Sequence, residues 1–207
     1  MMDFFTLEYW DLGKITELVG FVSGLLCVWL AVKQNIWTFP LALISAAFYV
    51  VVFRDALLFA DMGLQVMFAL LNVYGWYLWL YKGGERAERP VTKTHTWQWV
   101  LLLVLVPCFT YGLGRYLDLT TPADVPYWDA ATTGVSLAAQ WLMSRKKLEN
   151  WLLWLVVDIV YVPLYLYKEL YLTAILYAVF IPLAWIGYRD WKKAMQPQKP
   201  AFEGAQV

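Results

Sequence analysis

A carboxylate within an aromatic stripe is the feature of the sequence that most suggests binding chemistry. Asp158 ends the apolar stretch NWLLWLVVD, which spans 150–158. A charged group at the centre of a membrane-crossing helix costs about 2.5–3.5 kcal/mol on insertion scales, so it usually faces a cavity or a partner. Spacings of three and four residues place five side chains on one helix face: Trp151, Trp154, Asp158, Tyr161 and Tyr165. We predict that this face lines a binding site.

Two simpler interpretations of the same stripe stay open. Trp151 alone is also typical of an anchor at the membrane–water interface. Asp158 alone is also typical of a structural group that hydrogen-bonds another helix.

A second polar face occurs in the segment 62–81. Gln65 and Asn72 are seven residues apart, about two helical turns, so they point the same way. Amides offer both donors and acceptors, which suits hydroxyl and carboxamide partners. Hydrogen bonding between helices is the structural alternative. The predicted substrate-binding set is therefore Gln65, Asn72, Trp151, Trp154, Asp158 and Tyr161.

The chemistry of this set indicates a flat, positively charged ligand. Trp and Tyr rings hold a flat ring, and a cationic ring gains about 2 kcal/mol or more when it is desolvated. The Asp158 carboxylate adds complementary charge, and the two amides can bond polar substituents. Simple ions and sugars explain the aromatic residues less well.

Seven apolar segments must position these residues. The 207-residue chain is 61% hydrophobic and 15% charged, well below the quarter that is usual for soluble domains, so we predict an all-α integral membrane protein. The expected spans are 15–33, 36–53, 62–81, 97–116, 126–144, 150–167 and 170–188. The segment before them, MMDFFTLEYWDLGK, is acidic, unlike a signal peptide, and is expected to lie at the interface.

Composition also excludes several classes of function. One histidine, two cysteines and the absence of a glycine-rich phosphate loop predict no metal site, no cofactor and no enzyme activity. A net charge of zero gives no reason to expect a nucleic-acid partner. A membrane enzyme using Asp158 would need a second titratable group, and none is positioned by the sequence pattern to work with it.

The basic residues predict the orientation of the chain. With seven spans, four Lys and Arg residues fall on the side of the N-terminus and twelve on the side of the C-terminus. Cytoplasmic loops carry the excess of Lys and Arg. We expect a multi-pass protein of the bacterial inner membrane with the N-terminus outside and a cytoplasmic tail over 192–207.

The spans contain a weak internal repeat. Alignment of Trp37 with Trp151 places Arg54-Asp55 opposite Lys168-Glu169 between two spans, and WLAVKQ from Trp29 matches WLMSRK from Trp141. We predict a 3+1+3 arrangement in one domain, with three-helix bundles over 15–81 and 126–188 and a connector over 97–116. The extra span makes the two copies parallel, which is a transporter architecture. Chance likeness between apolar helices is the alternative.

Two motifs resemble the PnuC-type vitamin transporters. ENWLLWLVVD (149–158) is similar to their W-x-x-W-x-x-x-N/D motif, and GLQVMFALLNVYGWYLW (63–79) is similar to their Gln…Asn-x-Tyr-Gly-Trp-Tyr-x-Trp stretch. YWDAATTGVSLAAQWLMSRKKLENW (127–151) also fits, and the resemblance covers about 15–191. It implies a SWEET-like fold with the substrate near mid-membrane.

The resemblance also implies an activity. It implies uptake of a vitamin by facilitated diffusion through alternating access, with trapping by a cytoplasmic kinase, and it suggests a homotrimer. Nicotinamide riboside is the expected substrate. Thiamine is the alternative, because both molecules carry a ring cation that suits Asp158, whereas riboflavin is neutral. A vitamin-binding sensor that does not transport is a less favoured alternative, since the polar tail is too short for an output domain.

Overall fold

The computed structural model consists of seven α-helices, and it describes residues 12–55, 58–81, 89–121 and 126–195. The helices are α1 (Leu12–Val32), α2 (Thr38–Asp55), α3 (Phe59–Tyr81), α4 (Thr96–Thr120), α5 (Pro126–Ser144), α6 (Asn150–Tyr167) and α7 (Tyr171–Ala194). Helix α7 continues past 188, so the predicted tail begins later than 192. The predicted interfacial segment 1–11 and the tail from 196 onward lie outside the described residues.

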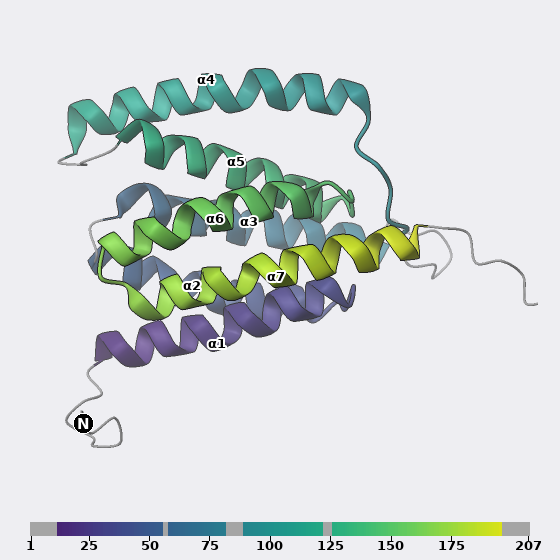
Figure 1. Ribbon diagram of the computed structural model, residues 1–207, viewed down its shortest axis with the longest axis horizontal. Helices are drawn as coiled ribbons and strands as arrows, with labels where there is room; N and C mark the ends of the chain where they lie inside the picture. The colour runs from purple at the N-terminus through teal and green to yellow at the C-terminus, as the bar shows by residue number, and fades with distance from the viewer. Residues whose placement is uncertain (1–11, 56–57, 82–88, 122–125, 196–207) are drawn as a thin grey trace, which may run out of the picture.

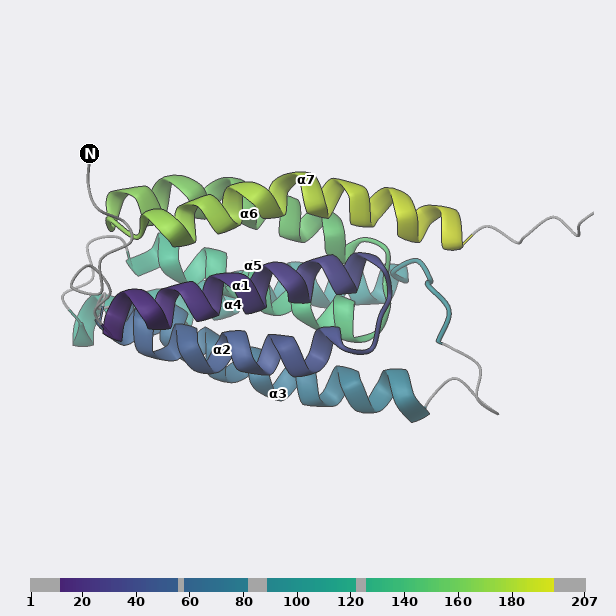
Figure 2. The ribbon, with the colours of Figure 1, turned by 90° about the horizontal axis from the view of Figure 1, so that it is seen from below.

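Six of the helices form a closed ring, and the seventh lies outside it. Each ring helix packs against two neighbours in the order α1, α2, α3, α5, α6, α7 and back to α1. Figure 2 shows α1 lying between α7 and α2. Helix α4 packs only against α5 and forms the outermost layer (Figure 1). The ring therefore encloses the space where inward-facing side chains meet.

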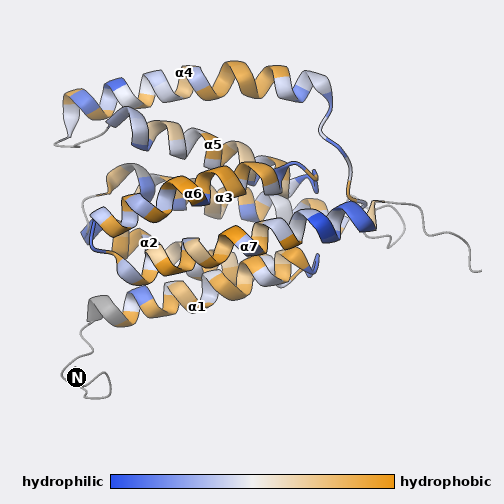
Figure 3. Cartoon of the chain, in the orientation of Figure 1, coloured by the Kyte–Doolittle hydropathy of each residue, from blue (hydrophilic) through white to orange (hydrophobic). Residues whose placement is uncertain are grey.

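Successive helices run in alternating directions, so α1, α3, α5 and α7 begin at one end of the bundle and finish at the other (Figure 1). We call these the Asp61 end, where α3 begins, and the Trp191 end, where α7 finishes. Hydrophilic residues gather at the last turns of α7 and in the turns at the Trp191 end (Figure 3).

The helices have the length and composition of membrane spans. All except α5 are long and apolar enough to cross a membrane by these two criteria. Large apolar side chains lie exposed on the outer surface, as expected for contact with lipid; examples on α4 are Val100, Leu103, Val104 and Leu105. Helix α5 falls short because it carries polar residues, and most of these are buried in the bundle: Thr132, Thr133, Ser136, Gln140 and Ser144.

Equivalent features recur at a separation of 112 positions. Helix α2 spans 38–55 and α6 spans 150–167, while α3 and α7 begin at 59 and 171. The turns at the Trp191 end match as well, since Gln34 and Lys146 both adopt positive φ angles of 55° and 50°. In each turn the next amide bonds a carbonyl five residues back, Asn35 to Leu30 and Lys147 to Leu142.

The segment before α4 is fastened to the turn between α5 and α6. Thr92 and Lys147 form a parallel bridge, and the Lys147 ammonium donates to the Thr92 hydroxyl and to the Lys93 carbonyl, both at 3.0 Å. One carboxylate oxygen of Glu149 accepts bonds from the backbone amide of Thr94 at 2.8 Å and from its hydroxyl at 2.7 Å. Lys147 and Glu149, two residues of this turn, thus hold the segment that leads into α4.

Replacement of Glu149 by alanine is expected to destabilise the folded protein by about 1.5–3 kcal/mol, because hydrogen bonds to a charged group contribute that much. The measurement is the thermal unfolding midpoint of the protein in detergent. Asp190→Ala is the matched control, since Asp190 forms only an exposed 3.9 Å ion pair with Lys33, and such pairs contribute little. Equal losses for the two variants would contradict a fastening role for Glu149.

Candidate functional site

A cavity lies inside the ring of six helices. The space between its lining atoms is about 970 Å³, including the part open to solvent. All six ring helices contribute side chains to its wall, whereas α4 contributes none. A cavity enclosed by six helices, mostly apolar with a few polar groups, has the character of a small-molecule site.

Five of the six residues predicted to bind substrate line this cavity. They are Gln65, Asn72, Trp151, Trp154 and Asp158. Tyr161 is not among the lining residues. It is buried nearer the Asp61 end, where its hydroxyl donates to Asp61 Oδ1 at 3.0 Å. Helical spacing placed Tyr161 on the correct face of α6, but one turn beyond Asp158 that face already packs against neighbouring aromatic rings.

Asp158 and Trp154 place an acidic group beside an aromatic surface in the wall of the cavity. Asp158 is 2% exposed, and its Oδ1 atom has no hydrogen-bond partner among the described residues. Trp154 lies one turn away on the same face, and the Phe68 ring meets it edge-on at 5.7 Å between centroids. A buried carboxylate without a partner is costly. The arrangement favours a ligand that brings a positive charge to Asp158 and a flat surface to Trp154.

An amide pair crosses the interface between α3 and α5. Gln140 Nε2 donates to Asn72 Oδ1 at 3.1 Å, and Asn72 Nδ2 donates to the Phe68 carbonyl at 2.8 Å. No described residue hydrogen-bonds the side chain of Gln65, which also lines the cavity. The amides of Gln65 and Gln140 therefore retain capacity for a ligand.

Gln140 was missed in the sequence analysis. Its signal is the spacing of Thr133, Ser136, Gln140 and Ser144, which places four polar side chains on one face of the segment 126–144. A polar stripe in an apolar bundle indicates a face that meets a partner helix or a cavity. The neighbour that gives Gln140 its role, α3, is set by the tertiary fold.

Small residues of α2 occupy the positions equivalent to Trp154 and Asp158. At a separation of 112, Ala42 corresponds to Trp154 and Ala46 to Asp158, and all four line the cavity. The alignment of Trp37 with Trp151 was wrong, because Trp37 is 65% exposed whereas Phe39 is buried. Phe39 approaches Gly75 as Trp151 approaches Gly187, again 112 positions apart. The α2 side of the cavity wall thus carries small side chains that leave space, whereas the α6 side carries the aromatic ring and the carboxylate.

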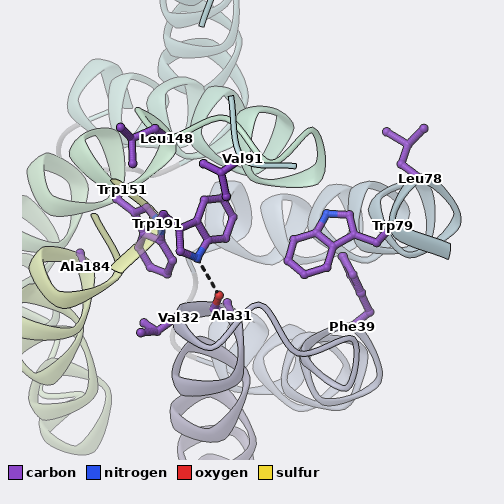
Figure 4. Close-up of a cluster of buried hydrophobic side chains, with 10 residues drawn as sticks. All are labelled: Ala31, Val32, Phe39, Leu78, Trp79, Val91, Leu148, Trp151, Ala184 and Trp191. Carbon is purple, nitrogen blue, oxygen red and sulfur yellow. Dashed lines mark hydrogen bonds between the residues drawn. The ribbon is translucent and has the colours of Figure 1, made fainter. Parts of the chain in front are cut away.

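A cluster of buried aromatic residues closes the cavity toward the Trp191 end. Trp151 meets Trp191 edge-on at 5.4 Å, Phe39 meets Trp79 edge-on at 5.0 Å, and the two tryptophans Trp79 and Trp191 are 6.2 Å apart (Figure 4). The Trp191 indole donates to the Ala31 carbonyl at 3.1 Å, which joins α7 to α1. The cluster fits tightly, since a Cβ at Gly187 would lie 2.6 Å from the Trp151 ring.

A second aromatic cluster closes the cavity toward the Asp61 end. Phe53 stacks on Tyr165 at 5.7 Å, and Tyr165 stacks on Tyr161 at 5.0 Å. Tyr177 packs against both tyrosines, at 5.1 Å from Tyr161 and 4.9 Å from Tyr165, and itself lines the cavity. Packed aromatic rings therefore lie toward both ends of the cavity.

Basic residues gather at the Trp191 end, in the turn between α5 and α6 and in the segment before α4. Burial, and to a smaller extent repulsion from Arg89, lowers the pKa of Lys147. Burial, followed by repulsion from Arg145, lowers the pKa of Arg89. The Lys146 ammonium lies 4.3 Å from the centroid of the Trp79 ring and bonds Gln34 at 3.2 Å. Positive charge is thus concentrated beside this aromatic cluster.

Comparison with known proteins agrees with this geometry. The chain is 29% identical to the nicotinamide riboside transporter PnuC of Escherichia coli (strain K12), over 92% of the chain and 94% of the relative. It is 25% identical to the riboflavin/roseoflavin transporter RibM of Streptomyces davaonensis, over 92% and 91%. A crystal structure of the vitamin B3 transporter PnuC superimposes with a TM-score of 0.75 at 25% identity, covering 87% of the chain and 82% of that structure.

These relatives are transporters, in agreement with the prediction that the chain is not an enzyme, and the resemblance to the PnuC-type vitamin transporters is confirmed. A family model described as nicotinamide mononucleotide transporter matches residues 14–193. The match includes all but the outermost residues of α1 and α7, and it includes every residue that lines the cavity. The chain therefore belongs to the nicotinamide mononucleotide transporter family.

Proposed function

We propose that the protein takes up nicotinamide riboside across the bacterial inner membrane by facilitated diffusion. The observation that carries this proposal is Asp158, which lines the cavity beside Trp154 and whose Oδ1 atom has no hydrogen-bond partner in the part of the chain that the structure describes. The pyridinium ring of nicotinamide riboside is flat and positively charged, so it would stack on Trp154 and place its charge near Asp158. The relative from Escherichia coli bears the name of a transporter for this vitamin.

In this proposal the polar substituents of nicotinamide riboside face the side of the cavity opposite α6. Gln65, Asn72 and Gln140 line the α3 and α5 side of the cavity. Their amides would hydrogen-bond the ribose hydroxyls and the carboxamide, each of which offers donors and acceptors. Trp151 would close the cavity on the side of the bound pyridinium that faces the Trp191 end. Tyr161 would act through the packing of the Asp61 end and not through direct contact.

We further propose that the two halves of the ring are parallel, SWEET-like repeats that rock about the cavity. The recurrence of helix bounds and turns at 112 positions supports this interpretation. The packing does so too, because in both α1–α2–α3 and α5–α6–α7 the middle helix packs against the first and the third. The repeats would be joined by α4. Alternating access would open the aromatic cluster at one end while the other stays packed.

The proposed orientation places the Trp191 end in the cytoplasm and the N-terminus outside. The basic residues around Lys147 and Arg89 support it, because cytoplasmic segments carry the excess positive charge. Phosphorylation by a cytoplasmic kinase would add negative charge that Asp158 repels, so the product would be retained. The kinase and a homotrimeric assembly are proposed on the family resemblance alone.

The deciding experiment is a binding titration of the purified protein with nicotinamide riboside, thiamine and riboflavin. Nicotinamide riboside is expected to bind most tightly, and Asp158→Asn is expected to weaken it at least tenfold, or about 1.4 kcal/mol. Riboflavin, which is neutral, should be less affected by the same change. Tighter binding of thiamine would replace the substrate while keeping the site. Equal affinities of wild type and Asp158→Asn for nicotinamide riboside would contradict the proposed role of Asp158.

Transport and simple binding are separated by flux into proteoliposomes. A transporter exchanges labelled nicotinamide riboside across the membrane at a rate that saturates with substrate. A membrane sensor would bind the vitamin in the titration yet show no flux above that of empty liposomes.

A further inference from the structure

Two acidic residues of neighbouring helices lie near the Asp61 end, outside the cavity lining. Asp61 is in the first turn of α3 and is fully buried, and Asp129 is in the first turn of α5 and is partly buried. Oδ2 of Asp61 and Oδ1 of Asp129 have no hydrogen-bond partner within the described part of the chain. The substrate site described above uses neither group.

The register between α3 and α5 brings these two side chains together. The two helices pack against each other and run in the same direction. The amide bond between Asn72 and Gln140 joins positions that differ by 68. Asp61 and Asp129 also differ by 68 and lie three turns earlier on the same faces. This register places the two carboxylates on the same faces of α3 and α5 as the bonded amides, and their negative charges repel each other.

The surroundings of the pair connect it to the aromatic cluster at this end. Tyr161 donates a hydrogen bond from its hydroxyl to Asp61 Oδ1 at 3.0 Å, and Tyr165 stacks on Tyr161. The Lys168 ammonium, just after α6, attracts Asp129. Tyr177 packs on both tyrosines and lines the cavity. The closed position of these rings is therefore linked to the state of the carboxyl pair.

The equivalent place in the other interface is satisfied differently. At a separation of 112, Thr173 corresponds to Asp61 and Glu17 to Asp129. Glu17 Oε1 accepts bonds from the Thr173 hydroxyl at 2.9 Å and from the Thr173 backbone amide at 3.2 Å. One interface thus pairs an acid with donors, whereas the other pairs an acid with an acid. In the second arrangement Tyr161 bonds one oxygen of Asp61, but Oδ2 of Asp61 and Oδ1 of Asp129 have no donor among the described residues.

We propose that Asp61 and Asp129 share one proton when the Asp61 end is closed and release it when that end opens. Two carboxylates in contact at a buried site cannot both carry charge without a large cost. One proton turns their repulsion into a hydrogen bond and needs no extra space. On this reading the proton enters and leaves at the same end, so pH controls closure without driving accumulation of substrate.

The test is equilibrium exchange of labelled nicotinamide riboside in proteoliposomes, with equal pH on both sides. Once both carboxyls are ionised, closure must take up one proton. The wild-type exchange rate should then fall toward tenfold per pH unit as the pH rises, the dependence for one proton. Asp61→Asn and Asp129→Asn leave one acid beside a neutral donor, so their profiles should be flat. Glu17→Gln is the matched control and should keep the wild-type slope.

The same slope in Asp129→Asn, or its loss in Glu17→Gln, would overturn the proposal. A requirement for Na⁺ at fixed pH that Asp129→Asn removes would also overturn it, because a metal cation would then occupy the pair. The inference rests on the proposed transport function, so infrared spectroscopy supplies a test without substrate. Wild type and Glu17→Gln should show a protonated carboxyl band that the double variant Asp61→Asn, Asp129→Asn lacks. That band could be found even if no vitamin is exchanged.

Discussion

Trp154→Ala is expected to weaken binding of nicotinamide riboside at least tenfold. The variant removes the ring surface that lines the cavity one turn from Asp158. Stacking of a desolvated cation on an indole contributes about 2 kcal/mol or more, and 1.4 kcal/mol corresponds to a factor of ten in affinity. The measurement is a titration of the purified protein, followed by intrinsic fluorescence or by heat.

Trp185→Ala is the matched control for this change. Trp185 lies on α7, is 51% exposed and does not line the cavity. The Trp185→Ala variant removes an indole of the same kind from the outer surface. Its affinity for nicotinamide riboside should stay within about twofold of the wild-type value, the scatter expected for surface substitutions. Equal affinities of Trp154→Ala and wild type would remove Trp154 from the proposed site.

Ala46→Phe is expected to reduce binding roughly a hundredfold, or about 2.7 kcal/mol. Ala46 is 4% exposed, lines the cavity and occupies the position equivalent to Asp158. A phenyl ring there would fill the open α2 side, where the proposal places the substrate. The same titration measures the effect, and gel filtration of the variant in detergent checks that it is folded.

The neighbouring residue provides the control. Ala47 is exposed on the outer side of α2, so Ala47→Phe adds the same ring facing away from the cavity. That variant should bind the vitamin like the wild type. If Ala46→Phe is folded and still binds with wild-type affinity, the substrate does not occupy the α2 side of the cavity.

Helical spacing alone was sufficient to predict five of the residues that line the cavity. Trp151, Trp154 and Asp158 belong to one helix, so a local pattern of three and four residues places them on one face. Gln65 and Asn72 were found in the same way. The seven helices also followed from apolar segments of sufficient length, with α5 the most polar of them.

The contributions that sequence could not supply depend on which helices become neighbours. Gln140 gains its role from Asn72 on another helix, and the acidic pair at Asp61 and Asp129 exists only because α3 and α5 share a register. Tyr161 lies on the predicted helix face but outside the cavity lining, because a helix face continues past the end of the cavity. The alignment of Trp37 with Trp151 failed because exposed and buried aromatic residues look alike in a sequence of this composition.

The fastening of the segment before α4 by Glu149 and Lys147 has a mechanical consequence. Helix α4 packs only on α5, and its entry is bound to the turn that follows α5. In the proposed rocking motion α4 would therefore move together with α5, α6 and α7, so that a three-helix part would move against a four-helix part of larger mass. Spin labels on α4 and α6 should keep a constant separation through the cycle, while the distance between labels on α4 and α2 changes.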